Sequence, residues 1–145
     1  MTTTVQGILR QKGNQVWSVS PTATVREALE VMADRKIGAV LVMEGGLLVG
    51  IFSERDYARR GVLMNRGPET PIGEMMTFPV YCVTPVQTIE ECMGLMTDKH
   101  IRHLPVVDGD TILGIVSIGD IVKEMIADQE HLIKGLENYI LGKRA

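Results

Sequence analysis

The chain has 145 residues, of which 45% are hydrophobic and 23% are charged, and its formal net charge is −3. This composition is ordinary for a globular protein that forms one compact domain or two small halves sharing a core. The negative charge gives no reason to expect binding to nucleic acid or to an anionic membrane, and no apolar run approaches the roughly 20 residues of a membrane span. Because residues 1–10 lack a secretory signal pattern, we expect a cytoplasmic protein.

The residues that serve metal binding and catalysis are sparse. Cys82 and Cys92 are expected to be buried, reduced thiols, since neither belongs to a Cys/His cluster with ligand spacing. The three histidines lack a convergent acidic cluster, so no metal site is predicted. The sequence also lacks a nucleophile elbow, a Walker loop and a C-x-x-C motif, which argues against an enzyme.

The first half of the chain alternates between helical and strand patterns. Thr24 with Glu27 three residues later matches a helix-capping box. The dipeptide Gly45-Gly46 separates two apolar runs and predicts a hairpin. In chain order we expect a short helix at 4–12, a strand at 16–19, a helix from Thr24, a hairpin formed by 39–43 and 47–52, and a helix at 53–63.

The second half repeats this order after a linker. Residues 67–79 contain Gly67, Pro68 and Pro71 and are interpreted as that linker, with a short helical turn near 73–76. The elements then expected are a strand at 80–83, a helix from Thr88 with Glu91 in a second capping box, a hairpin formed by 104–107 and 112–116, and a long helix at 118–141.

The two halves are related by an internal duplication. Adding 64 to each number aligns 16–57 with 80–121 without a gap, and 14 of the 42 aligned pairs are identical. The duplicated unit has the order β-α-β-β-α. Two such units, each with an apolar sheet face, would most simply bury those faces against each other.

The pattern G-I-x-S-x-x-D occurs once in each half, at 50–56 and at 114–120. Each copy lies between an apolar run and a helix, where free backbone N–H groups and the helix dipole suit an anionic ligand. The final carboxylate could accept hydrogen bonds from paired sugar hydroxyls, or it could serve only as a helix cap. Both roles stay open for Asp56 and Asp120.

The last helix extends past the duplicated unit. Its apolar positions from Ile118 to Tyr139 are spaced by four and three residues, with Gln129 as the one polar member. The half beyond Gln129 needs another surface for its apolar side. A second copy of the chain is the expected cover, and packing against residues 4–12 is the alternative.

With the duplication and the paired motifs in view, the sequence resembles the CBS-domain family, as a stand-alone tandem CBS pair or Bateman module. Segments 53–57, 101–106 and 116–120 are similar to small bacterial members and to plant mitochondrial single-pair proteins. The resulting fold class is α/β (α+β), with two pseudo-symmetric repeats packed sheet to sheet and a long C-terminal helix. The expected parts are an N-terminal segment 1–15, repeat one 16–66, a linker 67–79, repeat two 80–126 and a helical extension 127–145.

The resemblance implies a nucleotide sensor that binds AMP, ADP, ATP, S-adenosylmethionine or NAD(H) in clefts between the repeats, with no metal required. The carboxylates would bind ribose hydroxyls, the serines would support phosphate, and Ile37 and Ile101 would pack on adenine. The matching positions are, for the first site, Thr22, Ile37, Gly38, Ala39, Ser53, Arg55, Asp56, Arg102 and His103, and, for the second site, Thr84, Ile101, Arg102, His103, Ser117 and Asp120.

The flanks of the two motifs differ in charge. Repeat two has Arg102-His103 where repeat one has Gly38-Ala39, so the Asp56 site is expected to bind a multiply charged nucleotide more tightly than the Asp120 site. The output of such a module would act on a separate enzyme or through a homodimer. The alternative function is a structural homodimerisation module with degenerate ligand sites.

Overall fold

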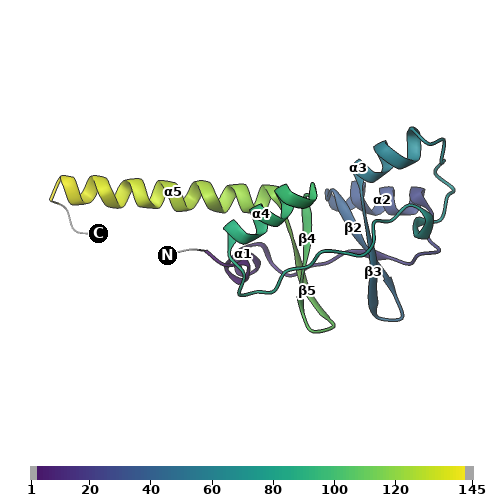
Figure 1. Ribbon diagram of the computed structural model, residues 1–145, viewed down its shortest axis with the longest axis horizontal. Coiled ribbons are helices and arrows are strands. Elements are labelled where there is room, and N and C mark those ends of the chain that lie inside the picture. Colours follow the sequence, from purple (N-terminus) through teal and green to yellow (C-terminus); the bar gives the residue numbers. More distant parts are fainter. Residues whose placement is uncertain (1–2, 143–145) are drawn as a thin grey trace. The chain divides into compact units, whose positions relative to one another are not determined.

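The computed structural model describes residues 3–142 and has the expected mixed α/β character, with two small sheets and a long C-terminal helix (Figure 1). Residues 1–2 and 143–145 of the predicted terminal segments lie outside the described residues. The chain divides into two compact units. The first unit is Gln15–Tyr81, and the second unit combines the residues up to Asn14 with those from Cys82 onward. The sheet-to-sheet packing of the repeats stays a prediction.

The first unit contains the three-stranded sheet. Its elements are β1 Ser18–Val19, α2 Val25–Arg35, β2 Ala39–Glu44, β3 Leu47–Ser53, α3 Glu54–Asp56, the π-helical η1 Tyr57–Val62 and the 3₁₀-helical η2 Ile72–Glu74. The strand order is β1-β2-β3, with β1 parallel to β2 and β2 antiparallel to β3. Thr24 caps α2 by accepting a hydrogen bond from the Glu27 N–H at 3.1 Å, which is one half of the predicted capping box; the reciprocal bond from the Thr24 N–H to the Glu27 side chain does not form in the described structure.

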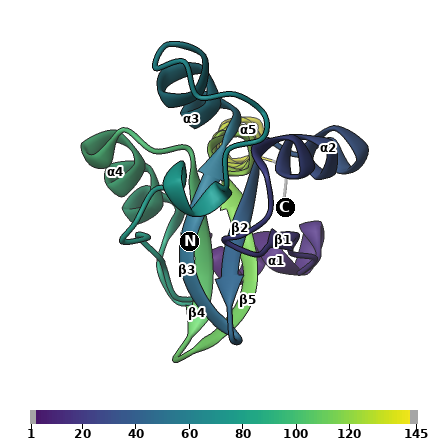
Figure 2. The ribbon, with the colours of Figure 1, turned by 90° about the vertical axis from the view of Figure 1, so that its right-hand side faces the viewer.

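The second unit contains the two-stranded sheet. Its elements are α1 Val5–Lys12, α4 Ile89–Lys99, β4 His103–Asp108, β5 Thr111–Ser117 and α5 Ile118–Ile140. Strands β4 and β5 form the expected hairpin, the counterpart of β2 and β3, and Figure 2 shows both as twisted two-stranded ribbons. Thr88 and Glu91 form the complete reciprocal capping box at the start of α4.

The predicted strand at 80–83 is wrong. No strand is formed by residues 80–83, and Val83 makes an isolated parallel bridge to Val106. In the first unit, the N–H of Leu41 donates to the carbonyl of Trp17 and joins β1 to β2. The residue aligned with Leu41 is Pro105, which has no N–H to donate. The second sheet therefore has no counterpart of β1 among the described residues.

The predicted helix at 53–63 has a different form. It begins as an α-helix at Glu54, but its turns widen to a π-helix from Tyr57 to Val62. A Cβ atom at Gly61 would lie only 2.6 Å from Cδ1 of Tyr57, so the wide turn brings the ring against a residue without a side chain.

Each unit has a core of its own, built mainly from aliphatic side chains and methionine, with one phenylalanine in the first core and one cysteine in the second. The first core contains Val25, Ala28, Met32, Val40, Val42, Phe52, Ile72 and Met75. The second core contains Val5, Ile8, Val83, Ile89, Cys92, Met96, Leu104, Val106, Val116 and Ile121. Both cores include residues from outside the predicted repeats: Ile72 and Met75 come from the predicted linker, and Val5 and Ile8 come from the predicted N-terminal segment.

These two segments, 3–9 and 70–76, cover the cores in the same way, and adding 67 converts one into the other. The N–H of Val5 donates to the carbonyl of Gln87 at 2.9 Å, and the N–H of Ile72 donates to the carbonyl of Ala23 at 2.7 Å. Two further pairs follow the same rule: Gln6 to Pro85 matches Gly73 to Pro21, and Ile89 to Thr3 matches Val25 to Thr70. Each core is thus covered by the segment that precedes the other repeat.

Helix α5 extends well beyond the rest of its own unit (Figure 1). Its apolar residues beyond Gln129 are exposed, with Leu132 at 64% and Leu136 at 54%. Within residues 3–142, no helix is both long and apolar enough to cross a membrane.

Candidate functional site

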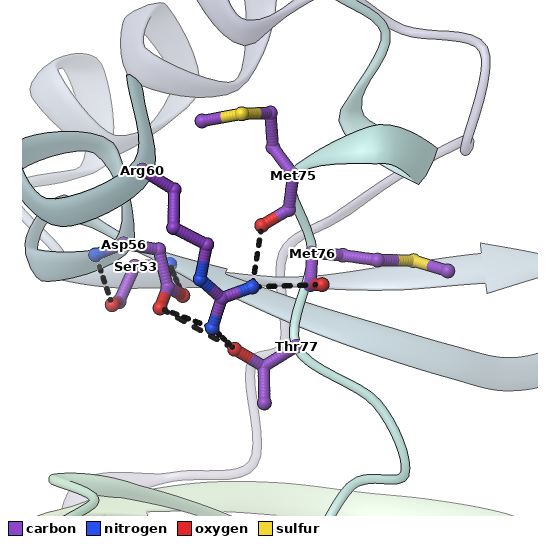
Figure 3. Close-up of polar contacts among 6 residues, drawn as sticks. All are labelled: Ser53, Asp56, Arg60, Met75, Met76 and Thr77. Atoms are coloured by element: carbon purple, nitrogen blue, oxygen red, sulfur yellow. Dashed lines mark hydrogen bonds and ion pairs between the residues drawn. The ribbon is translucent and has the colours of Figure 1, made fainter. Parts of the chain in front are cut away.

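The first G-I-x-S-x-x-D motif forms the turn between β3 and α3. The backbone N–H of Ser53 donates to Oδ2 of Asp56 at 2.9 Å, and the N–H of Asp56 donates to Oγ of Ser53 at 3.2 Å (Figure 3). This reciprocal pair is a capping box, so Asp56 does serve as a helix cap. Its side chain is 16% exposed, which leaves the carboxylate accessible at the strand end.

Arg60 binds this carboxylate from one turn further along. Its guanidinium donates to Oδ1 of Asp56 at 3.4 Å and to the hydroxyl of Thr77 at 2.7 Å, as Figure 3 shows. The other guanidinium nitrogen donates to the carbonyls of Met75 and Met76, both at 3.2 Å. The Thr77 hydroxyl also lies 3.3 Å from Oδ1 of Asp56. Both carboxylate oxygens of Asp56 therefore have protein partners.

The second motif repeats this turn between β5 and α5. The N–H of Ser117 donates to Oδ2 of Asp120 at 2.8 Å, and the N–H of Asp120 donates to Oγ of Ser117 at 3.2 Å. Here the cation is Lys12 of α1, whose Nζ lies 2.6 Å from Oδ2 of Asp120 and 2.9 Å from the carbonyl oxygen of Ile115. A carboxylate with a cation beside it thus recurs at the equivalent position of both units.

The electrostatics of Asp120 reflect this partner. Partial burial raises its pKa, but the hydrogen bonds from Lys12 and Ser117 and the charge of Lys12 outweigh burial, so the pKa of Asp120 lies below its ordinary value. A carboxyl whose folded-state pKa is depressed stabilises the fold above its unfolded pKa, and that stabilisation is lost as the pH falls through the folded pKa.

We therefore expect Lys12→Met to reduce stability in a pH-dependent way. Above about pH 5 the variant should be less stable by at most about 1 kcal/mol, because the ion pair is partly exposed. Below the unfolded carboxyl pKa of about 3.9 the difference should shrink, since the unfolded chain takes up a proton there before folded Asp120 does, and it should vanish once the pH has fallen through the lower folded pKa of Asp120. Urea unfolding from pH 3 to 7 measures this, with Lys123→Met as the control. An equal difference at pH 3 and pH 7 would contradict the assignment.

In each unit, the residues at the start of the hairpin lie next to the G-I-x-S-x-x-D motif at its end. The N–H of Glu54 donates to the carbonyl of Gly38 at 3.1 Å, and the N–H of Ile118 donates to the carbonyl of Arg102 at 2.8 Å. Ala39 is the cross-strand partner of Ser53, and His103 is that of Ser117. The predicted sets Gly38-Ala39-Ser53 and Arg102-His103-Ser117 are therefore each local clusters.

The other predicted residues lie at different distances from the motifs. Ile37 and Ile101 are partly buried against the first and second cores. Arg55 follows Glu54 in α3, next to Asp56. Thr22 bonds with Ser20, and the N–H of Thr84 donates to Gln87, so within the described chain their hydrogen bonds stay local. The predicted contribution of Arg102 and His103 to the Asp56 site would join the two units and stays a prediction.

Three residues at these sites were not singled out by the sequence as partners of the carboxylates. The Asp56–Arg60 pair has the i, i+4 spacing of a helical ion pair, so that partner could have been found. Thr77 and Lys12 carried no such indication, because they lie 21 and 108 residues from their partners. The residue aligned with Arg60 is Glu124, and this reversal of charge was the one sign that the second motif needs a cation from elsewhere.

The cysteines and acidic residues add no metal site within the described part of the chain. Cys92 is buried, as expected, whereas Cys82 is only partly buried, and neither cysteine is in a disulfide bond. Burial, together with the charge of Glu91, raises the pKa of Cys92 to about 11, so this thiol stays protonated near neutral pH.

Comparison with known proteins agrees with the duplication. The family model for the CBS domain matches residues 12–62 and 72–127. The chain is 35% identical over 115 residues to the CBS domain-containing protein YhcV of Bacillus subtilis, covering 79% of this chain and 82% of that protein. It is 33% identical over 151 residues to the mitochondrial CBS domain-containing protein CBSX3 of Arabidopsis thaliana, covering 97% and 73%.

Solved structures show the same relationship. A protein with CBS domains from Burkholderia ambifaria is 46% identical, with a TM-score of 0.84 over 88% of this chain and 96% of that one. The CBS domain pair of protein MJ0100, solved with 5′-methylthioadenosine and S-adenosyl-L-methionine, has a TM-score of 0.78 over 88% of this chain and 99% of that one, and at 24% identity shares the fold alone. The chain belongs to the CBS-domain family and contains two CBS repeats. The resemblance to small bacterial and plant mitochondrial members is confirmed.

Proposed function

We propose that this CBS pair is a cytoplasmic regulatory module that binds an adenine nucleotide, either AMP, ADP or ATP, or NAD(H), and changes its shape or partner affinity on binding. The observation that supports this most strongly is the recurrence of one arrangement in both units: a part-buried carboxylate at a strand–helix junction, held in a capping box with a cation beside it. A purely structural duplication would not need the cation in both units.

The geometry suits a ribose phosphate. A carboxylate accepts hydrogen bonds from paired hydroxyls and cannot donate, so it favours a diol over a phosphate. The neighbouring ammonium or guanidinium favours the phosphate, and in the second unit the positive end of the α5 dipole does so as well. The MJ0100 pair was solved with 5′-methylthioadenosine and S-adenosyl-L-methionine, which contain adenosine but no phosphate, so it supports the adenosine part of the ligand. The description of the Burkholderia protein as a candidate for signal transduction supports a regulatory role.

Binding of the nucleotide would regulate through population shift. A ligand that contacts both repeats favours the relative arrangement in which both sets of contacts form. The proposed output acts on a separate protein, such as an enzyme, or on the association of two copies of this chain. The module itself performs no reaction in this proposal.

The proposal is tested with Asp56→Asn and Asp120→Asn in the full chain. Asparagine keeps an oxygen that can accept the serine N–H, so the cap survives while the charged acceptor is lost. Each substitution should weaken binding of the preferred nucleotide about tenfold, since a charge-assisted hydrogen bond is worth about 1.5–3 kcal/mol. Calorimetry with AMP, ADP, ATP, NAD⁺, NADH and S-adenosylmethionine measures this.

Thr88→Ala is the matched control, because it removes a helix cap in the repeat that contains Asp120 without changing either carboxylate. It should lower stability by about 1 kcal/mol and leave nucleotide affinity unchanged. If the wild type bound none of these nucleotides, the alternative function, a structural homodimerisation module, would replace the sensor.

Helix α5 gives this alternative an observation of its own, and it also offers the sensor a route for its output. The apolar stripe of α5 continues past Gln129, yet its own unit leaves it uncovered there. The spacing by four and three residues from Ile118 to Tyr139 spans three heptads and matches the seam of a coiled coil. We propose that a second copy of this chain covers the stripe.

A further inference from the structure

A small open pocket of about 170 Å³ lies beside the second motif, between α1 and α5. It is lined by Ile8, Gln11, Lys12, Asp120, Lys123 and Glu124, all of which belong to the second unit. This volume is below the roughly 300 Å³ at which pockets begin to enclose a whole drug-sized ligand. The pocket therefore suits one polar moiety of a larger ligand.

The polar atoms that face this pocket are only partly used. An ammonium has three N–H donors. Within the described residues, Lys12 uses two of them, on the carbonyl of Ile115 and on Oδ2 of Asp120. The other oxygen of Asp120, Oδ1, accepts no hydrogen bond from the described part of the chain. One N–H donor and one carboxylate oxygen thus remain for a ligand, on side chains that are 36% and 24% exposed.

The first unit lacks this arrangement. There the cation is Arg60, which makes four hydrogen bonds to its surroundings, and both oxygens of Asp56 have protein partners. A carboxylate oxygen accepts about two hydrogen bonds, so Asp56 keeps one position for a ligand, on Oδ2, whereas Asp120 keeps two, both on Oδ1, as paired ribose hydroxyls require. The residue aligned with Arg60 is Glu124, whose charge opposes an anion, and Lys12 compensates for it from α1.

We propose that Lys12 is the phosphate-binding residue of the Asp120 site, and that the pocket between α1 and α5 takes the ribose 5′-phosphate of the nucleotide. The free oxygen of Asp120 accepts a ribose hydroxyl, and the third N–H of Lys12 donates to a phosphate oxygen. Lys123, on the same wall, adds positive charge. This inference rests on the proposed function and deepens it, because it assigns the N-terminal helix to the ligand site.

With Lys12 in this role, the Asp120 site should bind AMP more tightly than the Asp56 site, which is the reverse of the order expected from Arg102 and His103. The Asp120 site is prepared for a monophosphate without breaking an existing contact, and Lys12 neutralises the carboxylate that would otherwise repel the phosphate. Substitution of Lys12 should therefore weaken the binding of a phosphorylated ligand far more than the binding of a nucleoside. If Lys12 instead only filled the position at which a positively charged group of the ligand binds to Asp120, the Lys12→Met variant would bind the ligand more tightly.

The test is an NMR titration of the full chain, labelled at its isoleucine methyl groups. The ligands added are AMP, ribose 5-phosphate, adenosine and inorganic phosphate. Ile8 lines the pocket and reports on this site, and Ile72, buried in the first unit, serves as the reference. AMP and ribose 5-phosphate should shift the Ile8 signal. In Lys12→Met, the AMP affinity at this reporter should fall about tenfold, while the adenosine affinity changes less than about twofold.

A charge-restoring variant controls for a purely structural effect. Glu124→Arg places an arginine four residues after Asp120, as Arg60 stands to Asp56, so Lys12→Met/Glu124→Arg should regain most of the lost AMP affinity. Unchanged or tighter AMP binding by Lys12→Met overturns the proposal. An Ile8 methyl signal that does not shift with AMP, while calorimetry detects AMP binding, would also overturn the proposal about Lys12. The proposed function would then still stand. Absence of any binding by the wild type would refute both.

Discussion

The double substitution Leu132→Glu/Leu136→Glu is expected to yield a monomer at concentrations at which the unchanged chain is a dimer. Both leucines lie on the exposed stripe of α5, beyond the part that its own unit covers. A dimer through this stripe would bury both glutamates of each chain among apolar side chains without a partner charge. Such burial costs several kcal/mol per group, so the dissociation constant should rise by more than about a hundredfold.

Sedimentation velocity of the full chain measures this change. Ala127→Glu is the matched control, because it introduces the same side chain at an exposed position of α5 outside the stripe, and it should stay dimeric. A wild type that is monomeric at all accessible concentrations, or a double variant that dimerises as well as the wild type, would contradict the proposed homodimer.

Gly50→Ala should lower the free energy of unfolding by about 1–3 kcal/mol, the usual range for overpacking a core. A Cβ atom at Gly50 would lie 2.8 Å from Cγ and 3.0 Å from Cβ of Met76. The Cβ of Met76 can move only with the backbone, which is anchored because the Met76 N–H donates to Ile72 and the Thr77 N–H donates to Ile51.

Gly114→Ala, the equivalent change in the second repeat, should cost less, under about 1 kcal/mol. Its Cβ would lie 2.7 Å from Cδ2 of Leu9 but 3.6 Å from Cγ, so rotation of the leucine end relieves the contact. Urea unfolding of both variants tests the difference. Gly67→Ala is the control, because nothing lies within 4 Å of its Cβ position and the change should stay within about 0.5 kcal/mol. Equal losses at Gly50 and Gly114 would contradict this explanation.

What the sequence predicted correctly is what neighbouring residues determine. The two hairpins, the caps at Thr24 and Thr88, and the long last helix follow from turn residues, capping patterns and periodicity within a few positions. The family, too, followed from a repeat that is visible in the chain itself. The capping boxes of Asp56 and Asp120 were open alternatives, and the structure shows that both form.

What the sequence could not supply depends on residues far apart. Residues 80–83 have the composition of a strand, but Pro105 on the neighbouring strand removes the donor that would bind it. The pairing of Lys12 with Asp120 joins residues 108 positions apart, and no local pattern indicates it. Arg60 is one of several arginines in its segment, and its i, i+4 spacing from Asp56 is visible in the sequence, but its hydrogen bonds to Thr77 and to the Met75 and Met76 carbonyls are not.

The exchange of covering segments has a consequence for synthesis on the ribosome, which proceeds from the N-terminus. The first unit is one continuous stretch, and its cover at 70–76 emerges directly after its strands. The second unit is discontinuous, since α1 is made before repeat one but contacts partners that follow roughly 80 to 110 residues later. The apolar side of α1, with Val5 and Ile8, therefore stays without its native contacts until repeat two has left the exit tunnel. A nascent chain stalled when Tyr81 has left the exit tunnel but repeat two is still inside it would present a completed first unit preceded by an undocked α1.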